Sequence, residues 1–366
     1  MKISICGDVH WCTYSSILRK RGSKYSLRLE NLIQSVNWFL DTARKEGCSD
    51  VFFLGDFFDS NTLTAEEVSA LSQLSLNDKD IVVSFLVGNH EMGLANLEYS
   101  TAHSFLLNST SHVCDKPTIL AIGDCLVYIL PYELEVNRKE SIKEYFPAES
   151  FRDPGFSHRV LLSHNDIKGI QMGKFMSKEG FELEELSKTF DLVINGHLHN
   201  QEWVSKNVLN LGNITGQNFS EDATRYKHQC MILDCDTLEY KLITNPYALN
   251  FSKLDFTGKN DNIDYINNMS QLIGNNAVVS IKCNEENYNY IKHRFDPDVP
   301  KDKLIPRNCN IIQSRIIVER NVAEENSETK VETLRLDYLQ EFSDYITNTL
   351  GTSETVIKEL QQVIGR

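Results

Sequence analysis

Five short groups of Asp, Asn and His residues follow apolar segments in the first part of the chain. They are Asp8-Val9-His10, Gly55-Asp56-Phe57-Phe58-Asp59, Gly88-Asn89-His90-Glu91, Ser163-His164 and Gly196-His197-Leu198-His199. Imidazole and carboxylate groups together bind manganese, iron or zinc without any thiolate ligand. In D-x-H and H-x-H, alternate residues lie on the same side of an extended segment, so each pair can chelate an ion. The set therefore predicts a site for two divalent ions bridged by a carboxylate such as Asp56, about 3.5–4 Å apart.

A lone Asp or His after a strand is usually a turn residue or a surface group. Here the groups recur in order after short segments rich in Val, Ile, Leu or Phe, which predict strands at residues 2–6, 51–54, 82–87, 125–130, 160–163, 191–195 and 230–233. A helix is predicted over residues 27–45, where apolar side chains recur at helical spacing. This alternation indicates a layered α/β core. Because loops at the carboxyl ends of strands in such a sheet converge on one crevice, we expect the five groups to meet.

The amino-acid composition of the sequence changes from about residue 249. Residues 277–283 and 310–318 are strand-like and belong to a small unit at 249–323, while 324–330 form an apolar-free linker. Residues 331–366 carry two apolar stripes at helical spacing separated by Gly351, which predicts a terminal helical hairpin. We therefore expect a catalytic domain at 1–248, a small second domain, a linker and a hairpin.

Composition limits the functional classes. The 366 residues carry a net charge of −14, so contact with nucleic acid would need a local basic face or bound metal ions. The nine cysteines are scattered and include no C-x-x-C pair, which argues against a zinc finger or a disulfide framework and favours the cytoplasm. We see no signal peptide and no apolar run of membrane-spanning length, and we expect no membrane association.

The ordered set D-x-H, G-D-x-x-D, G-N-H-E, H and G-H-x-H resembles the motifs of calcineurin-like metallophosphoesterases. The resemblance implies a four-layer α/β/β/α sandwich. It also implies that Asp8, His10, Asp56 and His199 hold one ion and that Asp56, Asn89, His164 and His197 hold the other. His90 would face the scissile phosphate as an acid or transition-state stabiliser rather than as a ligand, and Asp59 would orient a ligand. The expected ions are Mn²⁺, with Mg²⁺ as an alternative.

Ser/Thr protein phosphatases share these motifs but usually place Arg-Gly after G-D-x-x-D and Arg before G-N-H-E. Here Ser60-Asn61 and Val87 stand at those positions, so the phosphate-gripping arginines are missing. The chain instead is similar to SbcD-type DNA repair nucleases, a group that includes the eukaryotic double-strand-break nuclease and the small subunit of a phage recombination endonuclease. The shared features are the segment Leu209–Asp222 after the last H-x-H, a small α/β capping domain, and the C-terminal helical hairpin.

This second resemblance implies a double-strand exonuclease and single-strand endonuclease in DNA recombination, repair or replication. The hairpin would bind an SMC-like coiled-coil ATPase of the SbcC type, with the chain acting as a homodimer within a heterotetramer. If the chain is phage-encoded, the location would be the cytoplasm of the bacterial host. A stand-alone phosphodiesterase for small phosphodiesters and a non-enzymatic scaffold are the alternatives.

A basic cluster lies in the loop after the first motif and consists of Arg19, Lys20, Arg21 and Lys24. The loop leaves the metal end of the sheet, so contacts with a phosphate backbone are expected there. A solvated charged loop explains the cluster equally well. The remaining histidines lack motif context and are interpreted as structural or surface residues.

Overall fold

The computed structural model describes residues 1–18, 20–76, 80–107, 111–172, 175–298 and 310–319. Residues Met1–Val318 form one compact unit, and Glu319–Arg366 belong to a second. The first sheet has the strand order β16-β15-β1-β2-β3-β6. Its strands are β1 (Lys2–Cys6), β2 (Asp50–Phe53), β3 (Val82–Leu86), β6 (Ser111–Cys114), β15 (Gln229–Asp234) and β16 (Tyr240–Thr244). The four strands β1, β2, β3 and β6 are parallel, so their carboxyl ends share one edge.

The second sheet has the order β13-β14-β12-β9-β8-β7. Its strands are β7 (Thr118–Ile122), β8 (Cys125–Leu130), β9 (His158–Ser163), β12 (Leu192–Asn195), β13 (Glu202–Ser205) and β14 (Val208–Asn210). Strands β8, β9, β12 and β14 are parallel. Two short hairpins, β4 (Met92–Gly93) with β5 (Asn96–Ser100) and β10 (Gln171–Met172) with β11 (Phe175–Met176), extend from the loops.

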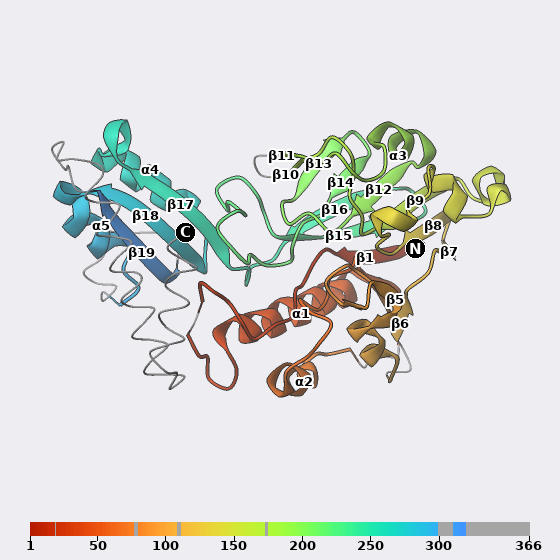
Figure 1. The fold of residues 1–366 in the computed structure, drawn as a ribbon, viewed down its shortest axis with the longest axis horizontal. Helices are drawn as coiled ribbons and strands as arrows, with labels where there is room; N and C mark the ends of the chain where they lie inside the picture. Colours follow the sequence, from red (N-terminus) through yellow and green to blue (C-terminus); the bar gives the residue numbers. More distant parts are fainter. Residues whose placement is uncertain (19, 77–79, 108–110, 173–174, 299–309, 320–366) are drawn as a thin grey trace, which may run out of the picture. The chain divides into compact units, whose positions relative to one another are not determined.

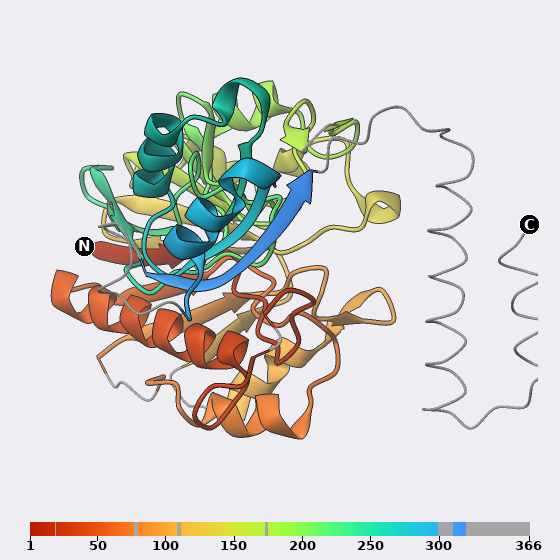
Figure 2. The same ribbon diagram turned by 90° about the vertical axis from the view of Figure 1, so that its left-hand side faces the viewer.

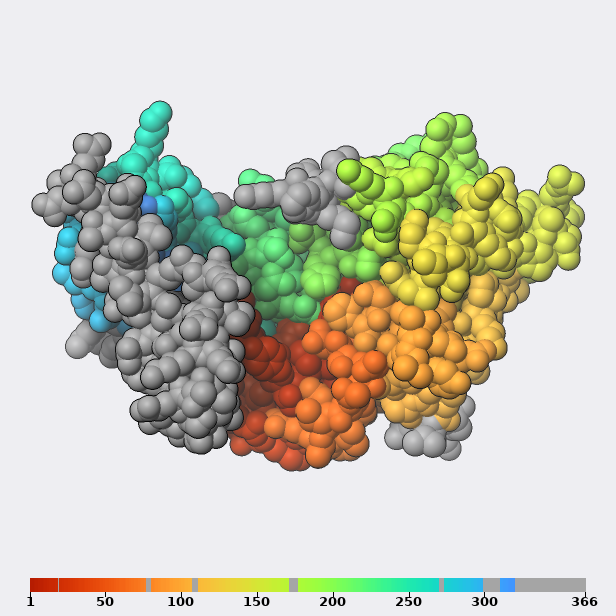
Figure 3. Space-filling model, viewed as in Figure 1, coloured from red at the N-terminus to blue at the C-terminus, as the bar shows by residue number. Residues whose placement is uncertain are grey.

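The two sheets face each other because their strands are apolar on both sides. In β2, Val51 and Phe53 pack with residues of the first helix, whereas Phe52 packs against strands of the second sheet. In β9, Val160 and Leu162 face the first sheet, and Leu161 faces the outer layer. Alternate side chains of each strand thus pack into two different hydrophobic cores, as expected for strands that are buried on both faces. The result is the predicted α/β/β/α sandwich. The space-filling view shows residues coloured red to orange on one side and residues coloured yellow to green on the other (Figure 3).

Helices cover the outer faces of both sheets. Helix α1 (Leu27–Glu46) and helix α2 (Ala65–Leu71) lie on the first sheet, and α3 (Leu183–Thr189) lies on the second. In Figures 1 and 2, α1 lies on one side of β1 and the second sheet on the other. The α1 helix begins where the Ser26 side chain accepts a hydrogen bond from Leu29 N–H and ends at Gly47, whose φ of 70° lies in the left-handed region. Short 3-10 turns are η1 (Thr101–Leu107), η2 (Glu135–Asn137), η3 (Ile142–Tyr145) and η4 (Ala148–Arg152).

A third, three-stranded sheet follows within the same compact unit. It contains β17 (Asn250–Phe256), β18 (Ala277–Asn284) and β19 (Ile311–Glu319), with helices α4 (Ile263–Leu272) and α5 (Tyr288–Phe295) and the turns η5 (Gly258–Asn260) and η6 (Glu285–Asn287). It has its own apolar core, but Leu249, Phe251 and Val278 also pack with Leu18 from the loop after β1. A small α/β unit is therefore present, and the predicted boundary between residues 248 and 249 stays a prediction.

The predicted strands and the first helix lie within one or two residues of the observed elements, including β18 and β19. The linker at 324–330 and the hairpin at 331–366 lie outside the described residues. Across the part of the chain that the structure describes, every helix is too short or too polar to cross a bilayer.

Candidate metal centre

The five motif groups do meet, but they come from two sheets rather than one. Asp8 and His10 follow β1, Asp56 follows β2, and Asn89 follows β3 of the first sheet. His164 follows β9, and the pair His197 and His199 follows β12 of the second sheet. The sheets are joined at this point by hydrogen bonds, since Asp8 Oδ1 accepts the N–H of His197 at 3.0 Å. Our argument from one open sheet was therefore wrong about the scaffold, although it predicted the convergence.

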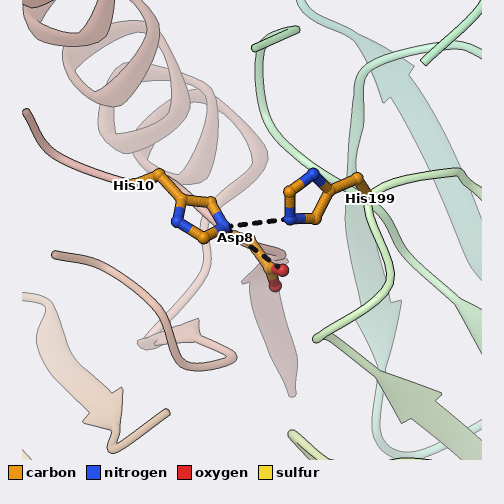
Figure 4. A group of neighbouring side chains, drawn as sticks. All are labelled: Asp8, His10 and His199. Carbon is orange, nitrogen blue, oxygen red and sulfur yellow. Dashed lines mark hydrogen bonds and ion pairs between the residues drawn. The ribbon is translucent and has the colours of Figure 1, made fainter. Parts of the chain in front are cut away.

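Asp8, His10 and His199 form the first group of side chains. The Nε2 atoms of His10 and His199 lie 3.1 Å apart, and His10 Nε2 lies 3.9 Å from Asp8 Oδ2. Figure 4 shows the two imidazole rings converging beside the Asp8 carboxylate. Asp8 Oδ2 is buried without a hydrogen-bond partner among the described residues. A buried carboxylate oxygen without a donor is costly unless a cation neutralises it.

Asp56, Asn89, His164 and His197 form the second group. His164 Nε2 lies 3.1 Å from Asp56 Oδ2, and Asn89 Oδ1 lies 3.3 Å from His164 Nε2 and 3.1 Å from His197 Nδ1. Asp56 also has a carboxylate oxygen within 4.8 Å of ring nitrogens of His10 and His90. Asp56 therefore belongs to the second group and lies close to His10 of the first, a position that suits a bridging ligand.

The outward-facing nitrogen of each of these four histidines has an oxygen partner. The partners are Asp59 Oδ1 for His10 Nδ1 at 3.0 Å, Glu221 Oε1 for His199 Nδ1 at 3.0 Å, Asp166 Oδ1 for His197 Nε2 at 3.1 Å and Leu54 O for His164 Nδ1 at 2.6 Å. When a neutral ring donates a hydrogen bond to its partner oxygen, its inward nitrogen is left with a lone pair. In that state the Nε2 lone pairs of His10 and His199, 3.1 Å apart, repel each other unless a cation lies between them. This pattern is typical of metal-binding histidines, so the residues fit a metal centre.

Backbone strain is concentrated in the same place. His10, Asp56 and His197 have φ values of 51°, 45° and 74°, in the left-handed region that residues with a side chain rarely adopt. Such strain is retained where function requires a particular geometry. Gly88 allows Asp56 to take this conformation, because a Cβ at residue 88 would lie 2.1 Å from Asp56 Oδ1 and 2.4 Å from Asp56 N. The sharp turns of the motifs thus bring the ligating atoms inward.

His90 differs from the other histidines of the site because its side chain is 43% exposed. Its N–H donates to Asp56 Oδ1 at 2.9 Å, and its Nδ1 lies 3.1 Å from the main-chain oxygen of Asp59. The ring is thereby held beside the Asp56 carboxylate, with Nε2 left for another partner. Asp59 itself is 42% exposed and contacts His10 through its carboxylate. His90 is thus a partly exposed imidazole beside Asp56, and Asp59 is a partly exposed carboxylate in contact with His10.

Two carboxylates that contact the histidines were missed in the sequence. Glu221 is 1% exposed and Asp166 is partly buried, and each accepts a hydrogen bond from one histidine of the G-H-x-H motif. Asp166 follows His164 by two residues, and Glu221 lies in the segment Leu209–Asp222 that follows the last H-x-H, so both had weak local signals. Asp166 is in turn approached by Arg138 Nη2 at 3.7 Å. These carboxylates fix the orientation of His197 and His199.

The charged groups of the site perturb each other strongly. Burial alone would raise the pKa of Asp56, but the neighbouring His164 imidazole holds that pKa well below its usual range. Burial lowers the pKa of His164, yet the Asp56 carboxylate raises it to a net value of about 9. Burial and the charge of Asp56 raise the pKa of Glu91 to about 8. Without a cation, the site therefore favours protonated His164 and neutral Glu91 at neutral pH.

These pKa shifts predict that the metal-free protein loses stability as pH rises. Because the folded-state pKa of His164, about 9, exceeds its ordinary value of 6.5, its contribution is complete below pH 6.5 and is lost as pH rises through 9. The raised pKa of Glu91 acts in the same direction up to about pH 8. Mn²⁺ should reverse the trend, since its binding requires deprotonated imidazole. Thermal unfolding with EDTA or Mn²⁺ between pH 6.5 and 9 measures both slopes, and a metal-free Tm that rises over this range would contradict the assignment.

Glu221→Gln should weaken metal binding by about 10–100-fold, the usual cost of losing an outer partner of a metal-bound histidine. The substitution keeps the shape of the side chain but replaces the charged acceptor of the His199 Nδ1 proton. Competition with a chromogenic chelator measures the affinity, and Glu149→Gln, at an exposed glutamate in η4, is the matched control. Unchanged affinity in Glu221→Gln would show that Glu221 does not position His199.

The basic cluster is less available than the sequence implied. Both carboxylate oxygens of Glu66 accept hydrogen bonds from Arg21 Nη1 at 2.8 Å. Lys24 lies over the ring of Tyr25, with its Nζ 4.9 Å from the ring centroid. Lys20 is exposed, and Arg19 lies outside the described residues. Arg21 is therefore the member of the cluster whose charge is already compensated by a carboxylate.

Known proteins are similar to the part of the chain that carries the five motif groups. The family model described as calcineurin-like phosphoesterase matches residues 1–201. Exonuclease subunit 1 of Enterobacteria phage T4 is 26% identical over 204 residues, which cover 54% of this chain and 55% of the phage protein. The chain thus spans about half the length of this relative.

Solved structures are similar at lower identity. A dimetal phosphatase from Danio rerio is 14% identical with a TM-score of 0.40, and the match covers 67% of this chain and 99% of that one. The protein TT1561 of Thermus thermophilus is 12% identical with a TM-score of 0.37, covering 66% of this chain and 98% of that one.

Proposed function

The chain belongs to the calcineurin-like phosphoesterase family, and on that premise we propose that it is a DNA nuclease that works with two divalent metal ions. The observation that carries the hydrolytic part is the pair of neighbouring ligand groups, with Asp56 of the second group close to His10 of the first. The DNA substrate is supported by the match to a phage protein named exonuclease subunit 1. The absence of the phosphatase arginines beside Asp59 and before Gly88 argues in the same direction.

We assign the ligands as the motifs and the distances indicate. Asp8, His10 and His199 would hold the first ion, Asn89, His164 and His197 would hold the second, and Asp56 would contact both. The donor set of oxygen and imidazole nitrogen without thiolate favours Mn²⁺, with Mg²⁺ as the alternative. When bound, two such ions polarise the phosphoryl oxygens and lower the pKa of water so that it attacks at neutral pH.

The side chains have separate tasks around that chemistry. His90, held through its Nδ1 contact with the Asp59 carbonyl, would donate a proton from Nε2 to the leaving oxygen. Asp59 accepts the Nδ1 proton of His10 and so keeps His10 Nε2 turned inward. Asp166 and Glu221 do the same for His197 and His199. We therefore propose His90 as the catalytic acid and the three carboxylates as positioning residues.

A panel of substrates tests the proposal. The purified chain with Mn²⁺ is incubated in parallel with linear duplex DNA, single-stranded DNA, bis(p-nitrophenyl) phosphate and a phosphoserine peptide. We expect exonucleolytic cleavage of the duplex, endonucleolytic cleavage of the single strand and slow hydrolysis of the diester. Hydrolysis of the diester with no cleavage of either DNA would replace the nuclease by a phosphodiesterase for small molecules. No Mn²⁺-stimulated activity at all would favour a non-enzymatic scaffold.

We further propose that residues 331–366 bind a coiled-coil ATPase of the SMC-like class, with two copies of this chain in the complex and the host cytoplasm as the location. The support is the word subunit in the name of the phage relative and the apolar stripes of that segment. Deleting residues 331–366 should abolish co-elution with the ATPase of the same genome on size-exclusion chromatography. Cleavage of the small diester should persist in the deleted chain. Co-elution of the truncated chain would contradict the assignment.

A further inference from the structure

A cavity of about 460 Å³ adjoins the metal centre on the side of the second sheet. His197 and His199 form the wall that the cavity shares with the metal centre, and β13, β14 and the loop at 220–226 enclose the rest. Its volume lies within the range of about 300–1,000 Å³ that is typical of small-ligand sites. A molecule in it would therefore lie directly beside a phosphate held at the metal ligands.

One side chain in the wall is suited to an anion. Among the described residues that line the cavity, Arg225 is the one lysine or arginine. Its side chain is 77% exposed and forms an ion pair with Asp222, whose Oδ2 lies 4.0 Å from Arg225 Nε, a distance too long for a hydrogen bond. Asp222 Oδ1 instead accepts from the N–H and the hydroxyl of Thr224. Arg225 can therefore offer its forked donors to a phosphate, which guanidinium groups bind in bidentate fashion.

The neighbouring wall residue is an aromatic ring. Tyr226 lines the cavity wall, and its N–H donates to the Asp222 carbonyl at 3.0 Å, which fixes the turn that presents it. Aromatic rings bind nucleobases by stacking, regardless of base identity.

We propose that this cavity is the subsite for the nucleotide next to the scissile phosphodiester, with Arg225 on its phosphate and Tyr226 stacked on its base. The inference rests on the proposed nuclease function. It adds a second place, besides the metal centre, at which the protein contacts the DNA. A cation and an aromatic ring at one cavity match the phosphate and the base of a nucleotide. A small aryl phosphodiester offers no second phosphate, so the subsite distinguishes DNA from such compounds.

Steady-state cleavage of a short single-stranded oligonucleotide by the Mn²⁺-loaded full chain tests the subsite. Arg225→Ala and Tyr226→Ala should each raise KM about 10-fold while kcat changes less than three-fold. Arg225→Lys should recover part of the loss, and Tyr226→Phe should behave as the wild type. Arg152→Ala, at an exposed arginine in η4, is the matched control and should leave KM unchanged. Equal melting temperatures of the variants show that each one folds.

Two further readouts separate a direct role from a structural one. Loss of one phosphate contact should reduce the dependence of log KM on log salt by about 0.7 in Arg225→Ala. The effect of Tyr226→Ala should disappear on an oligonucleotide that is abasic at the flanking position. If the wild type cleaves DNA and both alanine variants stay within two-fold of its KM, the subsite is wrong but the nuclease stands. If the wild type hydrolyses only the small diester, the nuclease and the subsite fail together.

Discussion

Replacing His90 with alanine is expected to slow phosphodiester cleavage by about 10²–10⁴-fold, the usual contribution of a general acid. The physical reason is that His90 is the exposed imidazole of the site, with Nδ1 on the Asp59 carbonyl and Nε2 left to protonate the leaving oxygen. The hydrogen bond from its main-chain N–H to Asp56 survives the substitution, so both ions should remain bound. Single-turnover cleavage and metal analysis of the same sample measure the two effects.

His112→Ala is the matched control, since His112 is exposed in β6, away from the motif loops. The control should cleave at the wild-type rate. Full activity of His90→Ala with two ions bound would remove His90 from the mechanism. Loss of metal from His90→Ala would instead make it a ligand, which its proximity to His10 and Asp56 allows geometrically.

Asp56→Asn is expected to reduce cleavage by about 10³-fold or more and to lower metal binding from two ions to one or none. Asp56 belongs to the second ligand group and lies close to His10 of the first, and a neutral amide cannot neutralise two cations at once. The loss reflects the several kcal/mol that metal ions contribute to stabilising transition-state charge, at about 1.36 kcal/mol for each factor of ten. Inductively coupled plasma analysis after dialysis counts the ions.

Asp59→Asn provides a graded comparison for Asp56→Asn. Asp59 contacts His10 but belongs to neither ligand group, so its loss should cost only about 10–100-fold in activity or metal affinity. An Asp56→Asn variant that keeps two ions, or one that is less impaired than Asp59→Asn, would contradict the bridging assignment.

The side chains proposed as metal ligands could be selected from the sequence because each follows a strand within a short motif. Their ligand chemistry is local, and the strand before each motif has a simple apolar pattern. Glu221 and Asp166 could not be assigned in this way. Glu221 is 22 residues from His199 in the sequence, and Asp166 is 31 residues from His197. Each pair is brought into contact by the packing of loops from one edge of the second sheet. Local spacing carries no information on such a contact.

Some elements of the fold could likewise be predicted from local sequence patterns, whereas others depend on tertiary packing. Strands β1, β3 and β8 are buried and apolar, and the sequence predicted them closely. The short hairpins β4-β5 and β10-β11 and the half-exposed strand β13 lack a strong apolar pattern and were not predicted. The distribution of the parallel strands over two sheets depends on which apolar faces pack together, and strand patterns alone do not specify that choice.

The basic loop illustrates a limit of charge counting. Arg21 looks available to DNA in the sequence, but Glu66 of α2 holds it through two hydrogen bonds. Arg225 carried no such expectation, because it belongs to no motif, and only the fold brings it to the cavity beside His197 and His199. The tertiary contacts therefore make Arg225, rather than Arg21, the arginine that we expect to contact DNA.

The location of bound Mn²⁺ by anomalous scattering from a crystal of the metal-loaded chain tests the central claim most directly. The account predicts two peaks about 3.5–4 Å apart. Asp8, His10 and His199 should contact one peak, Asn89, His164 and His197 the other, and Asp56 both. A single peak, or a second peak that Asn89 and His164 do not contact, would contradict a two-metal centre.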